Sequence, residues 1–297
     1  MPATAERRPT PGAASGSAAG SAALLSRALE VAGRLANDAA EVITATAGRG
    51  ADPHTKTSPY DWVTDTDRTL ERHTRRVLTG EFPGVPVLGE EYGGPDGFGP
   101  MPMPGSDGAA ELLWVVDPVD GTANYVAGLP WCGYSLALVD ARGPLVGVIA
   151  DPYQAQIYAA ARGRGLRANG RVVEPSTTAP AGDQPPLSGT LLCTEVSSPA
   201  VWGSVSALMQ HCRGERVGVR VLGSSALAVT QVALGRAAAA VLHEYEVWDV
   251  AGALALAAEA GMWIGSLDGS PTPLPLEGLV VANASLAPAV LELVGRG

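Results

Sequence analysis

The strongest constraint on the fold is a change of pattern on either side of a proline-rich segment, residues 175–186. Before this segment, apolar residues recur at helical spacing over residues 22–47. Strand-like stretches then follow, separated by turn signals such as Asn169-Gly170. After the segment, strand and helix patterns alternate. Because proline-rich segments are typical of boundaries, the sequence predicts an N-terminal α+β domain and a smaller C-terminal α/β domain.

The expected elements follow from these patterns. Residues 1–21 have no apolar repeat and are expected to form a disordered tail, so the two domains cover residues 22–175 and 187–297. In the first, helices at 22–47 and 67–79 cover a mixed, largely antiparallel sheet of strands at 112–116, 133–139, 145–150, 156–161 and 165–173, with a long loop at 93–108. In the second, strands at 190–194, 217–222, 237–242 and 279–282 alternate with helices at 201–211, 225–234, 247–261 and from residue 286.

Composition limits the classes of function. Hydrophobic residues make up 46% of the chain, enough for a sizeable core, and 30 acidic against 20 basic side chains give a net charge of −10. This charge argues against nucleic acid as a partner. No run of about 20 apolar residues is free of Gly, Pro or charge, and the N-terminus does not have a signal-peptide pattern. Three isolated cysteines fit a reducing compartment. We therefore expect a cytoplasmic protein with neither a membrane nor a nucleic-acid partner.

Acidic side chains concentrate in four short segments, each beside a predicted strand end or helix start. The segments are Asp61-Trp-Val-Thr-Asp-Thr-Asp67, Gly89-Glu-Glu91, Asp117-Pro-Val-Asp-Gly-Thr122 and Trp248-Asp249. Taken singly, these acids have ordinary interpretations. Asp-Pro and Asp-Gly are common turn formers, and an acid at a helix start, such as Asp67 or Asp249, is a common cap.

The segment from Asp117 to Thr122 has the most specific pattern. Asp117 falls at the end of an apolar strand, and the following proline predicts a rigid turn there. Two carboxylates three residues apart around this turn, with the carbonyl of Val119 between them, make a set of hard oxygen ligands suited to Mg²⁺. Gly121 allows a close approach of the backbone, and Thr122 opens a short helix whose free N–H groups favour phosphate.

Charge repulsion indicates what these carboxylates need if they lie close together in the fold. Two unit charges 4 Å apart repel by about 4 kcal/mol at an effective dielectric constant of 20. A cluster of Glu90, Asp117, Asp120 and Asp249 therefore needs protons or cations, and two or three Mg²⁺ ions shared through Asp117 are the simplest solution.

In this order, the segments resemble the inositol monophosphatase family, part of a lithium-sensitive, magnesium-dependent phosphatase superfamily that includes fructose-1,6-bisphosphatase. The resemblance rests on Trp114-Val-Val-Asp-Pro-Val-Asp-Gly-Thr-Ala-Asn-Tyr125, on Trp248-Asp-Val-Ala-Gly with Glu259-Ala-Gly261, and on the two upstream segments. It covers most of the chain from about Ala22 onward. It implies a layered αβαβα sandwich, hydrolysis of a small phosphate monoester such as inositol monophosphate, and a homodimer.

The resemblance also implies roles for individual residues. The metal ligands fall on Glu90, Asp117, the carbonyl of Val119, Asp120 and Asp249. Thr122 and Asp67, together with Glu90, orient the attacking water. The phosphate lies on Asp120, Gly121 and Thr122, and the alcohol portion of the substrate meets Gly223, Ser224, Ser225 and Glu244. Further candidates are Lys56, Glu91 and Glu246.

Several alternatives stay open. The segment from His243 to Asp249 is shorter than usual for the family and lacks its glycine, so either Glu244 or Glu246, or neither, contacts the substrate. Histidinol phosphate, sugar phosphates and nucleotide phosphates are alternative substrates, and a catalytically idle binding or regulatory protein is an alternative class. Asp65-Thr-Asp-Arg-Thr69 resembles a haloacid dehalogenase motif but follows a polar stretch rather than a buried apolar strand. Residues 163–168 spell a dinucleotide-type fingerprint, which we interpret as a hairpin.

Overall fold

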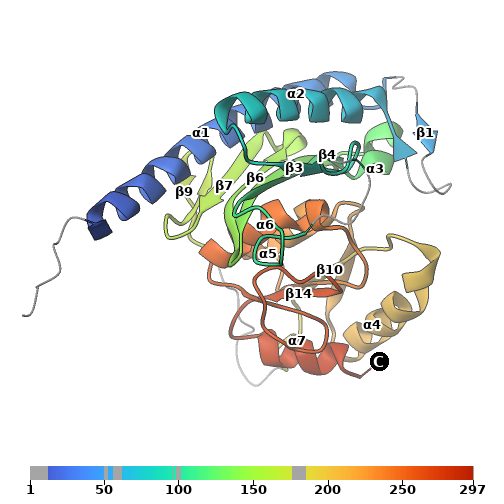
Figure 1. The fold of residues 1–297 in the computed structure, drawn as a ribbon. Helices are drawn as coiled ribbons and strands as arrows, with labels where there is room; N and C mark the ends of the chain where they lie inside the picture. Colours follow the sequence, from blue (N-terminus) through green and yellow to red (C-terminus); the bar gives the residue numbers. More distant parts are fainter. Residues whose placement is uncertain are drawn as a thin grey trace, which may run out of the picture.

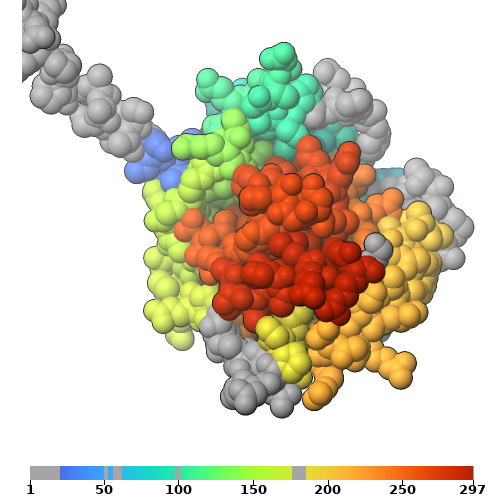
Figure 2. All heavy atoms as spheres, turned by 90° about the horizontal axis from the view of Figure 1, so that it is seen from below, coloured from blue at the N-terminus to red at the C-terminus, as the bar shows by residue number. Residues whose placement is uncertain are grey.

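The computed structural model describes residues 13–49, 53–55, 62–95, 97, 102–175 and 185–296, with side chains described from residue 21 onward. Its elements form the expected αβαβα sandwich (Figure 1). Helices α1 and α2 cover one face of a seven-stranded sheet, and α5 and α6 lie between this sheet and a five-stranded sheet. Helices α4 and α7 cover the outer face of the second sheet, and Figure 2 shows this C-terminal side of the molecule.

The helices lie close to their predicted positions. They are α1 (Ala13–Thr46), α2 (Asp65–Glu81), α3 (Thr122–Ala127), α4 (Trp202–Gly214), α5 (Ser225–Ala233), α6 (Val247–Glu259) and α7 (Ala287–Val294), with 3₁₀ turns at Pro152–Gln154 and Pro199–Val201. Helix α1 begins at Ala13 rather than near Ala22, so it includes part of the expected tail. Alanine has the highest helix propensity, and this alanine-rich stretch needs no apolar repeat to continue the helix.

The seven strands of the first sheet follow one another in chain order. They are β3 (Val87–Gly89), β4 (Leu113–Asp120), β5 (Gly133–Asp140), β6 (Gly143–Asp151), β7 (Gln156–Ala161), β8 (Leu166–Ala168) and β9 (Arg171–Val172). The β3–β4 pair is parallel and the other pairs are antiparallel. A separate antiparallel pair joins β1 (His54–Thr55) and β2 (Trp62–Val63), just before α2.

Strand β4 differs from the prediction. It does not end at Val116 before a turn but continues to Asp120, with a register shift against β5 between Asp117 and Asp120. A proline removes one ladder hydrogen bond, and a bulge is the place where a strand tolerates this. The two carboxylates therefore flank an irregularity within a strand rather than a turn.

The second sheet has the strand order β11-β10-β12-β14-β13. Its strands are β10 (Leu191–Thr194), β11 (Gly218–Val221), β12 (Ala239–Leu242), β13 (Trp263–Gly265) and β14 (Leu279–Ala282). Strand β10 pairs in parallel with both β11 and β12, whereas β14 is antiparallel to its two neighbours. Strand β13 is not predicted from the sequence, because three residues are too few to show an alternating pattern.

Close packing fixes α6 against the first sheet. A Cβ atom at Gly147 on β6 would lie 2.2 Å from the carbonyl oxygen of Gly252 on α6, so the helix and the strand approach nearly to backbone contact. This contact sets the position of the first turn of α6, which carries Asp249.

The three cysteines are buried free thiols. Within the described ranges, every helix falls short of the length or the apolar character needed to cross a bilayer.

Candidate active site

Four acidic side chains meet at one edge of the seven-stranded sheet. Glu90 directly follows β3, and Asp117 and Asp120 end the neighbouring parallel strand β4, so the carboxyl ends of these strands lie side by side. The N–H of Glu90 donates to the carbonyl of Val116 (3.3 Å). Asp249 comes from the first turn of α6. The Asp117 side chain is only 2% exposed and feels the charges of the other three acids.

Burial dominates the electrostatics of this acid cluster. It raises the pKa of Asp117 and of Asp249 well above their ordinary range, and the neighbouring carboxylates raise both further. Burial also raises the pKa of Asp120 to about 6, although several hydrogen bonds oppose the increase. The ionised cluster is therefore unfavourable in the protein alone, which is the condition that a bound cation relieves.

Asp120 is held by the N-terminus of α5. Its carboxylate accepts a short hydrogen bond from the hydroxyl of Ser224 and the N–H groups of Ser225 (3.2 Å) and Ala226 (2.7 Å). Ser224 is also the N-cap of α5, where its Oγ accepts the N–H of Leu227 (3.2 Å). In the structure, the segment that the sequence predicts to touch the substrate's alcohol fixes and stabilises the Asp120 carboxylate.

Thr122 and Asp67 form the second polar pair of the site. The Thr122 hydroxyl, at the start of α3, lies 3.1 Å from Oδ1 of Asp67 and 3.0 Å from the carbonyl of Val119, both of which are acceptors. Asp67 Oδ2 accepts the N–H (3.0 Å) and the hydroxyl of Thr64, the N-cap of α2. Burial raises the pKa of Asp67 to about 6. The Thr122 proton is directed to these acceptors, which leaves its oxygen able to accept a hydrogen bond from water.

Asp67 and Asp249 also act as helix caps. Each is the third residue of its helix and accepts the N–H of the N-cap residue, Thr64 for Asp67 and Glu246 for Asp249 (2.8 Å). A helix-capping role and a role in the site are therefore compatible, because each carboxylate caps its helix with one oxygen and also faces the site.

The remaining candidates differ in their exposure and in their partners. Glu244 is exposed and accepts hydroxyl protons from Ser198 (2.5 Å) and Ser197 (3.2 Å). Glu246, the N-cap of α6, is also exposed; partial burial and the charges of Glu244 and Glu90 raise its pKa. Glu91 is buried, Gly121 is the N-cap of α3, and Lys56 lies outside the described residues.

Comparison with known proteins decides the family. The model of the inositol monophosphatase family matches residues 24–296. An inositol-1-monophosphatase of Rhizobium meliloti is 33% identical over 243 residues, which are 80% of this chain and 84% of that protein. The chain belongs to the inositol monophosphatase family. Its class is therefore that of the phosphoric monoester hydrolases.

Two further relatives extend the comparison. A Nus factor SuhB of Xylella fastidiosa is 32% identical over 222 residues, 73% of each protein. A solved structure described as an IMPase/NADP phosphatase complexed with Mg²⁺ and phosphate matches with a TM-score of 0.68 at 22% identity, covering 83% of this chain and 87% of that one. The latter likeness supports the fold.

Three supporting residues of the site are not indicated by the sequence pattern. Glu71 and Glu195 each bind backbone N–H groups beside the site, and Asn124 binds carbonyls. Glu195, at the end of β10, accepts the N–H groups of Leu222 (3.1 Å) and Gly223 (2.7 Å), and burial raises its pKa to about 7. A signal existed, because Glu195 follows a predicted strand just as Asp117 does.

The donor set fits the metal dependence of the family. No group of three or more His, Cys, Asp or Glu side chains among the described residues is placed so that it could hold a metal ion. Mg²⁺ does not require such a group, because it is commonly held by one or two carboxylates with water and phosphate completing its shell. Oxygen donors of Asp117, Asp120, Asp249 and Glu90, gathered in one place, are of the kind that Mg²⁺ prefers.

The two misleading motifs have structural explanations. Asp65 is exposed in the first turn of α2 and follows the two-residue strand β2, not a buried strand. In the hairpin between β7 and β8, the N–H groups of Gly163, Arg164 and Gly165 all donate to the carboxylate of Glu259 (2.8, 2.9 and 2.7 Å). This backbone nest is thus filled by the protein's own side chain.

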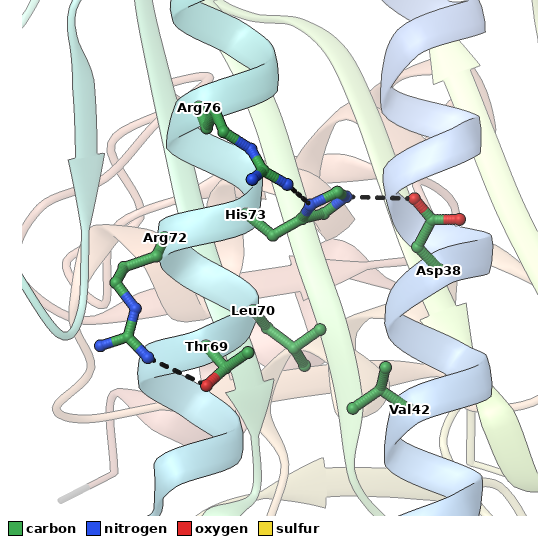
Figure 3. A pocket seen from close by; sticks show the side chains of 7 residues that line it. All are labelled: Asp38, Val42, Thr69, Leu70, Arg72, His73 and Arg76. Carbon is green, nitrogen blue, oxygen red and sulfur yellow. Dashed lines mark hydrogen bonds and ion pairs between the residues drawn. The ribbon is translucent and has the colours of Figure 1, made fainter.

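A cavity of about 610 Å³ lies between α1 and α2 (Figure 3). Its lining includes Asp38, His73 and Arg76, where His73 meets Asp38 (3.2 Å) and Arg76 lies 3.0 Å from the other ring nitrogen of His73. Of its described lining residues, none belongs to the acid cluster, so this groove is separate from the candidate active site.

Proposed function

We propose that the chain hydrolyses a small phosphate monoester of the inositol monophosphate type with bound Mg²⁺. The observation that carries this proposal is the convergence of Glu90, Asp117, Asp120 and Asp249, from three elements, in one cluster, in which Asp117 and Asp120 are buried and the other two are partly exposed. These carboxylates and the Val119 carbonyl would hold two or three ions, with Asp117 shared. When bound, the ions supply charge neutralisation at the phosphate and activation of water, as in a two-metal site.

The residues of the chain then position the reactants. Thr122 orients the attacking water by accepting a hydrogen bond from it, because the hydroxyl's own proton is directed to Asp67 and Val119. Glu90 is the second group that orients this water. The phosphate lies on the Asp120–Thr122 segment, where α3 begins without a side-chain cap on its N–H groups. Catalysis of this kind is mostly positioning and charge neutralisation.

The alcohol portion of the substrate is assigned to the side of the site formed by Gly223, Ser225 and Glu244. Glu244 is held at its carboxylate by two serine hydroxyls, so it presents a fixed acceptor near the end of β12. Histidinol phosphate, sugar phosphates and nucleotide phosphates are alternative substrates for the same chemistry. Assembly as a homodimer and a cytoplasmic location stay predictions from the sequence.

The test is a phosphate-release screen over these four classes of ester, with Mg²⁺, with EDTA, and with added Li⁺. We expect release of phosphate from at least one ester with Mg²⁺, its loss with EDTA, and its loss in Asp117→Asn, with the fold unchanged by circular dichroism. Near-normal turnover of Asp117→Asn would refute the assignment.

A binding or regulatory role is a second candidate, favoured by the likeness to the protein described as a Nus factor. The wild-type assay, together with Asp117→Asn, separates the two functions. Loss of phosphate release supports catalysis, whereas a wild-type protein that releases no phosphate from any of the esters supports the second role.

A further inference from the structure

Helix α2 presents two acidic side chains to the sheet, Asp67 and Glu71, one turn apart. Both are fully buried, at 0% exposed. Asp67 holds Thr122, one of the two groups proposed to orient the water. Glu71 contacts the turn after β3, which carries the other group, Glu90.

The Glu71 carboxylate binds the backbone directly after Glu90. Its Oε2 accepts the N–H of Glu91 at 2.7 Å, and its Oε1 accepts the N–H of Tyr92 at 3.2 Å. Hydrogen bonds to a carboxylate are among the stronger ones in proteins. Two consecutive peptide groups of the turn are therefore fixed to α2.

Arg75, one helical turn further, completes a clamp around the same turn. Its Nε donates to Oε1 of Glu71 (2.8 Å), and its guanidinium also donates to the carbonyl of Val87 (3.0 Å) and closely to that of Gly93. Val87 begins β3, and Gly93 pairs with Gly89 through two N–H···O bonds of 3.0 Å. Arg75 thus joins the strand before Glu90 to the backbone after it.

Gly89 has no side chain, and the space this leaves is occupied by the Glu71 carboxylate. A Cβ atom at this position would lie 2.2 Å from Oε1 of Glu71, well inside any allowed contact. The carboxylate therefore rests directly against the backbone that precedes Glu90, and only glycine permits this approach.

We propose that Glu71 and Arg75 are positioning residues that hold Glu90 at the acid cluster, so that α2 sets the arrangement of Glu90 relative to Thr122. This inference rests on the proposed function. A purely structural tie is the alternative, but the Glu71 carboxylate is fully buried and Arg75 is only 22% exposed. Such an ion pair is a costly way to fasten a turn, since apolar replacements of similar volume are often equally stable. A role in holding a metal ligand in place explains why this ion pair is present.

The test compares Mg²⁺ binding, measured by calorimetry, in the wild type and in Glu71→Gln. This substitution keeps the shape but removes the charge and one acceptor. We expect Mg²⁺ affinity to fall about 10–100-fold, the usual effect of losing an outer partner of a metal ligand. In the metal-free protein, the amide hydrogens of Glu91 and Tyr92 should exchange faster with solvent.

Neighbouring residues of α2 supply a matched pair. Arg75→Gln removes the clamp and should weaken Mg²⁺ binding in the same way. Arg76→Gln changes the next arginine, which points to His73 in the groove of Figure 3, and should leave Mg²⁺ affinity unchanged. Glu81→Gln is the matched glutamate control, because Glu81 pairs with Arg27 and Arg34 at the far end of α2.

The outcomes are distinct. A wild type that does not bind Mg²⁺ overturns the proposed function. A wild type that binds Mg²⁺, with equal affinity in Glu71→Gln and Arg75→Gln, overturns this inference alone, even where these variants melt at a lower temperature. If Glu71→Gln fails to fold, the pair Arg75→Gln and Arg76→Gln decides, since a loss of affinity in the first and not in the second supports the clamp.

Discussion

The hydroxyl of Thr122 lies 3.1 Å from Oδ1 of Asp67, and this contact joins the start of α3 to the first turn of α2. Both groups are buried, and Asp67 is fixed at its other oxygen by Thr64. The Thr122 oxygen therefore has one defined orientation toward the site.

Replacing Thr122 by valine should reduce phosphate release about 10²–10⁴-fold, the usual range for a positioned group that orients or transfers a proton. Mg²⁺ affinity should stay close to that of the wild type, since the Thr122 side chain is not proposed as a ligand. Thr122→Ser keeps the hydroxyl and should keep most of the rate. Steady-state kinetics check this, and a rate for Thr122→Val within threefold of the wild type contradicts the role.

Removing the hydroxyl of Ser224 should shift the pH dependence of Mg²⁺ binding upward. The short hydrogen bond from Ser224 lowers the pKa of Asp120, which burial raises to about 6. Without that bond, the Asp120 pKa rises further, and its carboxylate ionises only at higher pH. Calorimetric titrations with Mg²⁺ between pH 5.5 and 8.5 measure the midpoint. Ser225→Ala is the control, because its backbone N–H bond to Asp120 is kept and the midpoint should not move.

The metal-free protein should lose stability as the pH rises from about 4 to about 7. The folded-state pKa of Asp67 is raised by burial from an ordinary value of 3.8 to about 6, so its protonated form favours the folded state. This contribution is present below about pH 4 and is lost as the pH passes through 6, at a cost of up to about 3 kcal/mol. Asp117, Asp120 and Asp249 act in the same direction.

Thermal unfolding in EDTA measures this effect, with the same series in Mg²⁺ as the comparison. Mg²⁺ should raise the melting temperature at pH 7.5 and have little effect at pH 4.5, because it binds the folded, ionised cluster. A metal-free protein that is most stable at pH 7.5 would contradict the prediction.

Glu259 should contribute to stability and not to catalysis. Its carboxylate accepts three N–H groups of the hairpin between β7 and β8, which ties α6 to the first sheet. Glu259→Ala leaves these donors without their acceptor and should lower the free energy of unfolding by about 3 kcal/mol. Urea unfolding checks this, with Glu292→Ala as an exposed control expected to change it by less than about 1 kcal/mol. Unchanged stability in Glu259→Ala would show that solvent replaces the carboxylate.

Much of the fold was predictable from sequence because helical and alternating patterns are long in most elements. The features that the sequence did not predict are local ones. The bulge that lets β4 pass Pro118 depends on pairing with β5, which is distant in the sequence. Helix α1 extends to Ala13 through propensity rather than through pattern.

For the candidate site as well, some residues were predictable from the sequence and others were not. Asp117, Asp120 and Asp249 were found because their segments are distinctive, and the structure gathers them with Glu90. Glu71 was missed because a glutamate on a helix of many charges looks like a solvent-facing residue. Its burial becomes evident only when α2 packs against the turn after β3.

Diffraction from crystals soaked in Mn²⁺, recorded at the manganese edge, tests the central claim most directly. We predict two or three anomalous peaks among the carboxylates of Glu90, Asp117, Asp120 and Asp249, with Asp117 in contact with more than one ion. Peaks only at other surfaces, or an ordered cluster with no ion at saturating Mn²⁺, would contradict the account.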